Sequence, residues 1–396
     1  MRKVKKTMNI ILACIGALLI AVIATLSLAS GVFQPQKYME PWRKDYALQY
    51  DDPRVQLAAH GLLAANGHNM QPWNIVLDED DPNAFYLYVD TDRLTNEVDP
   101  LARQMLITQG TFLEYVKIAG DELGYPAAIE LFPEGEYDEQ NLADSMEEKP
   151  VAKIELTKEN PHVNPLYGYM FLPDTNRAAY GPEALTQAQI DQLEMINTED
   201  TMAVQIFQDN EDMEKLGGYA MEGARIESGI SRIMAESEFR ANERQKNKYR
   251  YGYSVEGQGT AGIMRHIMQG MVTLFPNMNG EEASAQMFIQ STQTSVDNTP
   301  AYAMIITDDN SRENQVLSGM LYSRLVLTAH QNGLVMQPLS QVLEEYPEME
   351  AQYQSIHSEY ARDGGTIQML VRLGRPTKDT PLTMRQDVMD LVAGER

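Results

Sequence analysis

The first apolar pattern after the N-terminal segment is that of a helix followed by a strand. Asp52 and Pro53 form a typical helix start, and the apolar residues that follow recur at helical spacing (Val55, Ala58, Ala59, Leu62 and Leu63). We expect this helix to end at Asn66-Gly67, because glycine readily takes the left-handed conformation in which helices stop. A strand is predicted from Asn74 to Leu77. The stretch 67–73 therefore lies at a junction between two elements.

Similar patterns continue along the chain. Helices are predicted over residues 100–123, 188–196, 211–246, 263–275, 282–293 and 312–332. Thr186 and Gln189 are predicted to form a Thr-x-x-Gln capping box ahead of the second of these helices. Strands are predicted over residues 85–89, 129–132, 151–156, 203–207, 301–307 and 366–373. Helices and strands are mixed in both halves, so we expect an α+β fold.

Residues 1–36 form a separate apolar segment. A basic flank precedes thirty uncharged residues (Arg2, Lys3, Lys5 and Lys6, then 7–36). The core, Ile10 to Leu28, approaches the roughly 20 apolar residues that span a bilayer. Ser27-Leu28-Ala29 is also compatible with signal-peptidase cleavage, so an anchor and a cleaved signal both stay open, although the long core favours a single-pass transmembrane helix. The basic flank places the rest of the chain outside the cytoplasm.

Charge and cysteine content limit the possible partners. The chain has 57 acidic and 32 basic residues and a net charge of −25. A nucleic-acid partner would require a basic face, so we expect none. The only cysteine, Cys14, lies in the apolar segment, and the remainder is compatible with an oxidising compartment. An anionic ligand would need arginines gathered locally against this acidic background.

The stretch Gly67-His68-Asn69-Met70-Gln71-Pro72-Trp73 is the first candidate site. The amides of Asn69 and Gln71 offer donors and acceptors that suit the edge of a heterocycle, or they satisfy the backbone of the loop. Asn-x-Gln-Pro-Trp after an alanine-rich helix resembles the flavin-binding signature of the nitroreductase family. With His68 in front, it most resembles the long, single-chain, Acg-like branch. The resemblance implies a nitroreductase-like fold that holds FMN non-covalently, with Asn69 at the pyrimidine side of the flavin and His68 and Gln71 close by.

Two further segments resemble phosphate-binding parts of the family. Thr175-Asn176-Arg177 resembles the segment that meets the FMN phosphate, where an arginine can hold phosphate through two parallel hydrogen bonds. In close relatives another arginine precedes the threonine, but here Asp174 stands there. Pro381-Leu382-Thr383-Met384-Arg385 resembles a segment that brings a second basic residue to the phosphate. The resemblance thus implies cofactor-binding roles for Asn176, Arg177 and Arg385.

The segment Pro338-Leu339-Ser340 matches the place where the family lays main-chain amides beside flavin N5. A hydrogen-bond donor there favours the charge of the reduced flavin. Ser340 is therefore a position in the site and not an acid or a base. No side chain is assigned a catalytic role, and the six histidines show no metal-binding spacing.

The chain is long enough to hold two nitroreductase-like units. Residues 37–52 are interpreted as a linker, followed by halves at 53–172 and 173–396. A shift of 209 residues aligns the two long predicted helices without a gap (Gly110 on Gly319, Phe112 on Leu321, Val116 on Leu325, Ile118 on Leu327 and Gly124 on Gly333). The family resemblance implies homodimers in shorter members, so we expect an internally duplicated monomer here.

These observations lead to two hypotheses of function. The first is an FMN-dependent oxidoreductase of the nitroreductase type that transfers two electrons to a small organic acceptor. The alternative is a protein that binds or sequesters flavin with little or no turnover. A flavin-free extracellular module that kept only the fold is a third possibility. In each case we expect a single-pass cell-membrane protein with its folded part outside the cytoplasm.

Overall fold

Two antiparallel sheets of four strands organise the part of the chain that the computed structural model describes, residues 2–361 and 364–392. The first sheet has the order β1-β2-β4-β3 (Trp73–Leu77, Ala84–Val89, Ala152–Leu156 and Ala127–Leu131). The second has the order β5-β8-β10-β9 (Met202–Phe207, Ala301–Thr307, Thr366–Gly374 and Val335–Pro338). A long helix follows the second strand of each set, α3 (Arg103–Leu123) after β2 and α11 (Arg312–Gln331) after β8. The two sheets therefore share their strand order and the position of their long helix.

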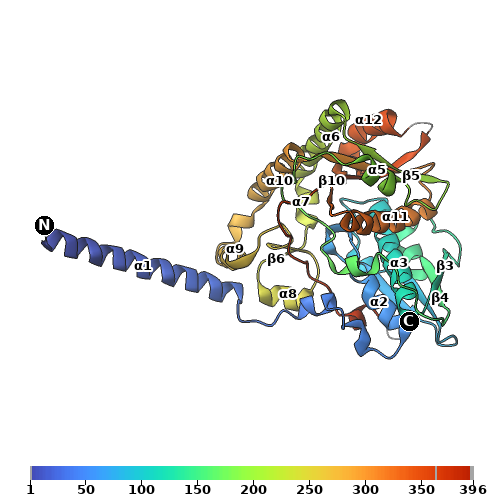
Figure 1. Ribbon diagram of the computed structural model, residues 1–396, viewed down its shortest axis with the longest axis horizontal. Coiled ribbons are helices and arrows are strands. Elements are labelled where there is room, and N and C mark those ends of the chain that lie inside the picture. The colour runs from blue at the N-terminus through green and yellow to red at the C-terminus, as the bar shows by residue number, and fades with distance from the viewer. Residues whose placement is uncertain (1, 362–363, 393–396) are drawn as a thin grey trace.

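Helices α3 and α11 pack against each other at the centre of the body (Figure 1). A Cβ atom at Gly110 would overlap the carbonyl oxygen of Val316, and one at Gly319 would overlap that of Ile107. The contact is reciprocal, because the shift of 209 residues that pairs the two glycines also pairs Ile107 with Val316. Glycine at both positions allows the two backbones to approach this closely.

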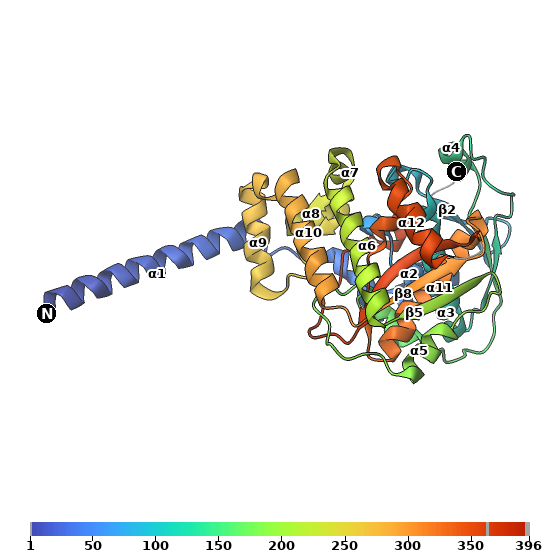
Figure 2. The same ribbon diagram turned by 90° about the horizontal axis from the view of Figure 1, so that it is seen from above.

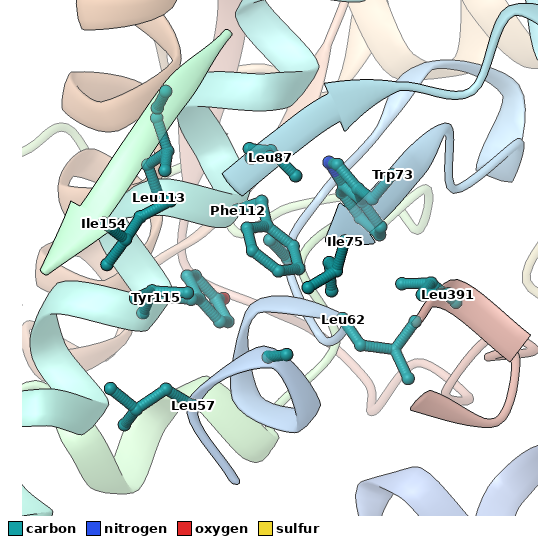
Figure 3. Packing of buried hydrophobic residues seen from close by; sticks show 14 of the residues in the cluster. Leu57, Leu62, Trp73, Ile75, Leu87, Phe112, Leu113, Tyr115, Ile154 and Leu391 are labelled. Atoms are coloured by element: carbon teal, nitrogen blue, oxygen red, sulfur yellow. The ribbon is translucent and has the colours of Figure 1, made fainter. Parts of the chain in front are cut away.

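The core around the first sheet gathers residues from both ends of the chain. Leu57 of α2 (Pro53–Gly61) belongs to the same cluster as Trp73 and Ile75 of β1, and Leu62 lies between Ile75 and Leu391 of α13 (Val388–Leu391) (Figure 3). The C-terminal segment of the expected second half thus packs into the first half. Residues 393–396, which also belong to that expected half, lie outside the described part.

The expected linker is packed against the body. It forms two short 3-10 helices, η1 (Lys37–Trp42) and η2 (Ala47–Gln49). The indole nitrogen of Trp42 donates a hydrogen bond of 2.8 Å to the carbonyl of Thr383, and the amide of Arg385 donates one of 3.0 Å to the carbonyl of Tyr38. Tyr38, Trp42 and Tyr46 are buried. Residues 37–52 and the C-terminal segment therefore hold each other in place.

A helical insertion separates β5 from β8 (Figure 2). It contains five helices, one 3-10 helix and two short parallel strands (α6 Asn210–Ser228, α7 Ser231–Glu236, α8 Glu243–Tyr249, α9 Gly262–Leu274, α10 Glu281–Asp297, η6 Pro276–Asn279, β6 Phe239–Arg240 and β7 Tyr253–Ser254). The single helical stretch expected over 211–246 is wrong. It breaks at Gly229, which caps α6, and again where Phe239 and Arg240 pair with β7.

All the predicted strands are present, and the remaining helices agree with the predicted ones to within a few residues. The first helix is an exception, since α2 ends at Gly61 and not at Asn66-Gly67. The sequence patterns did not predict the shorter elements (α4 Leu142–Glu148, α12 Glu350–Tyr360, η3 Gly67–Asn69, η4 Thr91–Arg93, η5 Tyr167–Phe171, η7 Ser340–Leu343 and η8 Pro347–Met349). The predicted capping box of Thr186 and Gln189 is confirmed at the start of α5 (Gln187–Glu194).

Helix α1 (Arg2–Ser30) projects from the body (Figure 1). Its stretch Val4–Ser30 is long and apolar enough to cross a membrane, and its most apolar window is not buried by the rest of the chain. A signal sequence has the same length and composition. The mixed helix and strand content and this candidate span agree with the sequence-based expectations.

Candidate functional site

A cavity of about 620 Å³ lies between α3, the segment 337–341 and the helical insertion. Its walls come from residues 65–68, the first half of α3, α7, α10, residues 337–341 and the side of the 174–177 segment that carries Asp174, Thr175 and Arg177. A smaller cavity of about 80 Å³ adjoins it and shares Asn66, His68, Asp174, Thr175 and Arg177. The larger volume is within the range of cavities that hold small ligands and cofactors.

The loop beside the cavity contains a cluster of unusual backbone conformations. His68, Asn69 and Gln71 have φ values of 52°, 53° and 52°, in the left-handed region that side chains other than glycine rarely adopt. From the sequence, the left-handed conformation was expected at Gly67. Hydrogen bonds overcome the strain, including that from the Gln71 amide to Asn66 Oδ1 at 2.8 Å and that from the Gly252 amide to the Asn69 carbonyl at 2.9 Å. Strain of this kind is concentrated at functional sites.

His68 lines both cavities. Its ring packs on that of Tyr253 with centroids 5.3 Å apart, and its buried Nδ1 has no hydrogen-bond partner among the described residues. Burial, and then the positive charge of Arg177, lower the pKa of His68 to about 4, so the imidazole is neutral at pH 7. A neutral imidazole with a free nitrogen can donate a hydrogen bond to a ligand or accept one from it.

The amides of Asn69 and Gln71 are occupied by the protein itself. Asn69 Nδ2 donates to the carbonyls of Gly252 at 3.1 Å and Met384 at 3.3 Å. Gln71 Nε2 donates to the carbonyl of Arg250 at 2.9 Å, while its Oε1 accepts from the amide of Gln386. Asn69 lines only the small cavity and Gln71 lines neither. The sequence left open whether these two amides bind a ligand or the nearby backbone. In this structure they form hydrogen bonds with backbone groups.

The expected role of Arg385 at the phosphate requires correction. The side chain is fully buried and lines neither cavity. Its guanidinium donates to Asn69 Oδ1 at 2.9 Å and to the carbonyls of Leu63 at 3.0 Å and Met384 at 2.9 Å, and it lies 3.6 Å from the Asp174 carboxylate. Arg385 therefore ties the C-terminal segment to the loop 63–69.

Asn176 also lies outside both cavities. It is buried, its Oδ1 accepts from the Ala178 amide at 2.9 Å, and its Nδ2 donates to the carbonyl of Lys378. These two bonds hold the turn before Tyr180 against the segment after β10. Its contribution is therefore to shape the segment that carries Arg177.

Arg177 is the arginine that remains available to a ligand. It lines both cavities, and Nη1 donates a bond of 3.0 Å to the carbonyl of Gly257, which leaves Nε and Nη2 without a hydrogen-bond partner among the described residues. Arg103 also lines the large cavity, but its guanidinium is bound to the carbonyls of Leu343 and Gln368 and to Glu345. Arg177 together with Thr175 therefore forms the anion-compatible end of the site.

The segment Pro338-Leu339-Ser340 lines the large cavity. Leu339 donates its amide to the carbonyl of Leu370 at 2.9 Å. Ser340 Oγ both donates to that carbonyl and accepts from the Leu370 amide, at 2.9 and 3.0 Å. The segment is therefore fixed to β10 as a rigid wall, and the Ser340 hydroxyl is not free to act as an acid or a base.

Two carboxyl groups in the cavity wall were not singled out from the sequence. Burial raises the pKa of Glu227 to about 7, and its Oε2 has no hydrogen-bond partner among the described residues. Burial and the nearby charges of Glu227 and Asp99 raise the pKa of Glu344 well above its usual value, and Gln104 donates to that carboxyl. Glu227 belongs to a strongly charged helix, so only its burial distinguishes it from solvated neighbours.

Comparison with known proteins gives only distant structural matches. No protein-family model matches the sequence, and no curated protein matches it. The chain is similar to a BluB-like flavoprotein from Clostridium difficile 630, with 11% identity over 59% of this chain and 100% of that one and a TM-score of 0.35. It is also similar to a nitroreductase with bound FMN from Desulfitobacterium hafniense DCB-2, with 11% identity, the same coverage and a TM-score of 0.33.

A third similar structure is the FMN-dependent nitroreductase NfnB from Mycobacterium smegmatis in complex with NADPH. The identity is 12%, the match covers 57% of this chain and 95% of that one, and the TM-score is 0.30. These structural neighbours are nitroreductase-like proteins.

Proposed function

We propose that the chain is an FMN-binding oxidoreductase that transfers two electrons to a small organic acceptor. The observation that carries the proposal is the large cavity between the guanidinium of Arg177, which keeps unused donors, and a strained loop. In that loop the buried His68 Nδ1 has no hydrogen-bond partner in the part of the chain that the structure describes. Strain and an unsatisfied buried nitrogen at the same wall favour a ligand that completes the site.

The residues present fit FMN at both ends of the cavity. Arg177 and Thr175 supply donors for a phosphate. His68 and the wall of Pro338-Leu339-Ser340 face the larger space in which a flat ring system would lie. FMN, when bound, supplies the two-electron chemistry, while the protein binds, orients and shields it. Asn69 holds the loop that carries His68 in place.

The buried carboxyl groups of Glu227 and Glu344 supply hydrogen-bond donors at the wall of the cavity formed by α6 and the 340–344 segment. Because burial raises their pKa values, both groups keep a proton to a higher pH than an ordinary carboxyl group does. A protonated carboxyl at Glu227 donates a hydrogen bond to an oxygen or nitrogen of an organic acceptor without adding negative charge beside it.

We also propose that the chain is internally duplicated and functions as a monomer of the Acg-like type. The shared strand order of the two sheets and the reciprocal contact of Gly110 with Gly319 support the duplication. We place the boundary between the halves near residue 173, with the C-terminal segment crossing back to the first half. The duplication supplies within one chain the subunit interface that shorter nitroreductases form between two chains.

We further propose that α1 anchors the protein in the cell membrane with its body outside the cytoplasm. The four basic residues before the span support this orientation. Soluble NAD(P)H is scarce outside the cytoplasm, so a membrane quinol or another extracellular reductant is the expected electron donor.

The test is the visible spectrum and FMN stoichiometry of the purified full chain in detergent. A flavin spectrum at a ratio near one per chain is expected. Arg177→Ala removes a charged hydrogen-bond donor, which is worth about 1.5 to 3 kcal/mol, and should weaken FMN binding about ten-fold or more. Arg375→Ala, at an exposed arginine outside both cavities, is the matched control.

Three results would change the proposal. Equal FMN affinity in the Arg177 and Arg375 variants would remove the phosphate assignment. Tight FMN binding that no donor reduces would favour the alternative, a flavin-sequestering protein. If the folded chain takes up no FMN, the third possibility, a flavin-free module, replaces both.

A further inference from the structure

The end of α1 is held directly against α9, which crosses it in Figure 2. The approach is close, because a Cβ atom at Gly270 would overlap the backbone of Leu26. Ser30 Oγ and His266 Nδ1 lie 3.2 Å apart at the same crossing. The position of α9 relative to a membrane is therefore fixed by the position of α1.

The length of α1 places this crossing at the edge of the bilayer. Roughly 20 residues of helix cross the hydrocarbon layer, and counted from Thr7, after the last basic residue of the flank, this length ends near Leu26. Arg244 lies beside Gly31, because a Cβ atom added to Gly31 would be 3.9 Å from the Cγ atom of Arg244. Basic side chains are favoured at this depth, because their long apolar stems let the charge reach the polar head groups.

A buried polar cluster fixes α9 to the body. Lys246 Nζ donates to Glu243 Oε1 at 2.9 Å, to Tyr38 Oη at 2.8 Å and to Glu256. Gln269 of α9 donates from Nε2 to Glu243 Oε1 and to Glu256 Oε2, each at 3.3 Å. Because these groups are buried and bound to one another, α9 cannot swing away from the crossing.

Helix α9 and the segment that follows it through η6 expose a group of large apolar side chains, here called the α9 face (Ile263, Met264, Leu274, Phe275 and Met278). Met278 directly precedes Asn279, which lines the large cavity. Met287 of α10 is both exposed and part of the cavity wall. The mouth of the cavity therefore borders the α9 face.

We propose that the α9 face lies in the interface of the bilayer that α1 enters, and that the large cavity opens toward this interface and admits apolar molecules dissolved in the membrane. A helix with one apolar face lies in the plane of the interface with that face buried among the lipid chains. The proposal specifies the electron acceptor of the proposed function as an apolar molecule dissolved in the membrane. It rests on the membrane anchoring proposed above and does not require FMN to be bound.

The test measures the depth of single labelled cysteines in the full chain, reconstituted into vesicles that contain lipids brominated on their acyl chains. Cys14→Ser removes the native thiol, and cysteine replaces Phe275, Met287 or, as control, Met195. Phe275 and Met195 are 58% and 80% exposed, and Met195 lies at the end of α5, away from α1 (Figure 2). A bimane label at 275 and at 287 should lose at least half of its fluorescence to brominated lipid, while the label at 195 should lose little.

Each outcome decides one part of the proposal. Equal quenching at 275 and 195 would overturn the membrane contact of the α9 face. Quenching at 275 without quenching at 287 would overturn the opening of the cavity toward the bilayer. FMN content, measured on the same vesicles, separates these results from a failure of the flavin assignment. A further variant carries the label at position 278, through Met278→Cys in the Cys14→Ser protein. Adding Phe275→Asp to it should reduce quenching of the label at 278, because a charged carboxylate moves out of the lipid chains.

Discussion

Arg385 Nη1 donates a hydrogen bond of 2.9 Å to Asn69 Oδ1, although the two residues are 316 positions apart in the chain. Both residues belong to segments that resemble flavin-binding motifs, yet in the structure they bind each other. The bond fixes the C-terminal segment against the strained loop 67–71. Each residue therefore acts on the cavity through the position of His68.

Substitution of Arg385 should destabilise the whole protein. Arg385→Ala removes a buried cation from the Asp174 carboxylate and four carbonyl and amide oxygens, so we expect a loss of about 3 to 5 kcal/mol in the free energy of unfolding. Asn69→Ala should cost about 1.5 to 3 kcal/mol. Denaturant unfolding of both single variants and of the double variant measures their coupling. Strictly additive losses would show that the two side chains act independently.

An added carbon atom at the crossing of α3 and α11 should lower the stability of the protein. Gly110→Ala places a methyl group on the carbonyl of Val316, and overpacking of this kind costs about 1 to 3 kcal/mol or more. Gly218→Ala is the matched control, because this helical glycine in α6 has no atom within 4 Å of its Cβ position and should gain up to about 1 kcal/mol. Thermal or denaturant unfolding compares the two. Equal stability of both variants would contradict the close crossing.

Stability should fall as the pH rises through the range in which Glu227 ionises. Its pKa increases from 4.5 to about 7 on folding, so the folded state holds a proton that the unfolded state releases. The associated stability is complete below pH 4.5 and is lost by about pH 7. Glu227→Gln should flatten the dependence of unfolding free energy on pH, whereas Glu214→Gln, on an exposed part of the same helix, should leave it unchanged.

A monomer is expected in detergent solution. The second half supplies the helix that α3 packs against, so no second chain is required at that surface. Light scattering coupled to gel filtration, corrected for bound detergent, should give a protein mass near 44.6 kDa. A tight dimer that binds two flavins would argue against the duplication.

The proposed topology predicts accessibility of the body from outside the cell. Protease added to intact cells or spheroplasts should digest residues 37–396, and NADPH should reduce bound flavin slowly compared with a membrane quinol. Protection until the cells are lysed would reverse the topology. Cytosolic NAD(P)H would then become the expected donor.

The sequence alone determined the local elements of this protein. Apolar spacing located the strands and most helices, because which face of an element is buried follows from the period of its apolar residues. It also located the candidate span in α1 and the pair of matched glycines, Gly110 and Gly319. Residues whose function depends only on neighbours in the chain, such as the Thr186 cap, were predicted correctly.

Only the tertiary structure decided which candidate side chains face a cavity and which are used within the protein. Gln71, Asn176 and Arg385 have the chemistry of ligand-binding residues, but backbone groups from distant segments occupy them. Arg177 and His68 retain free nitrogens, and Glu227 changes its pKa because of burial. A sequence pattern gives the type of each donor and acceptor. The partner of each one is set by folding, which brings together residues hundreds of positions apart and removes them from water.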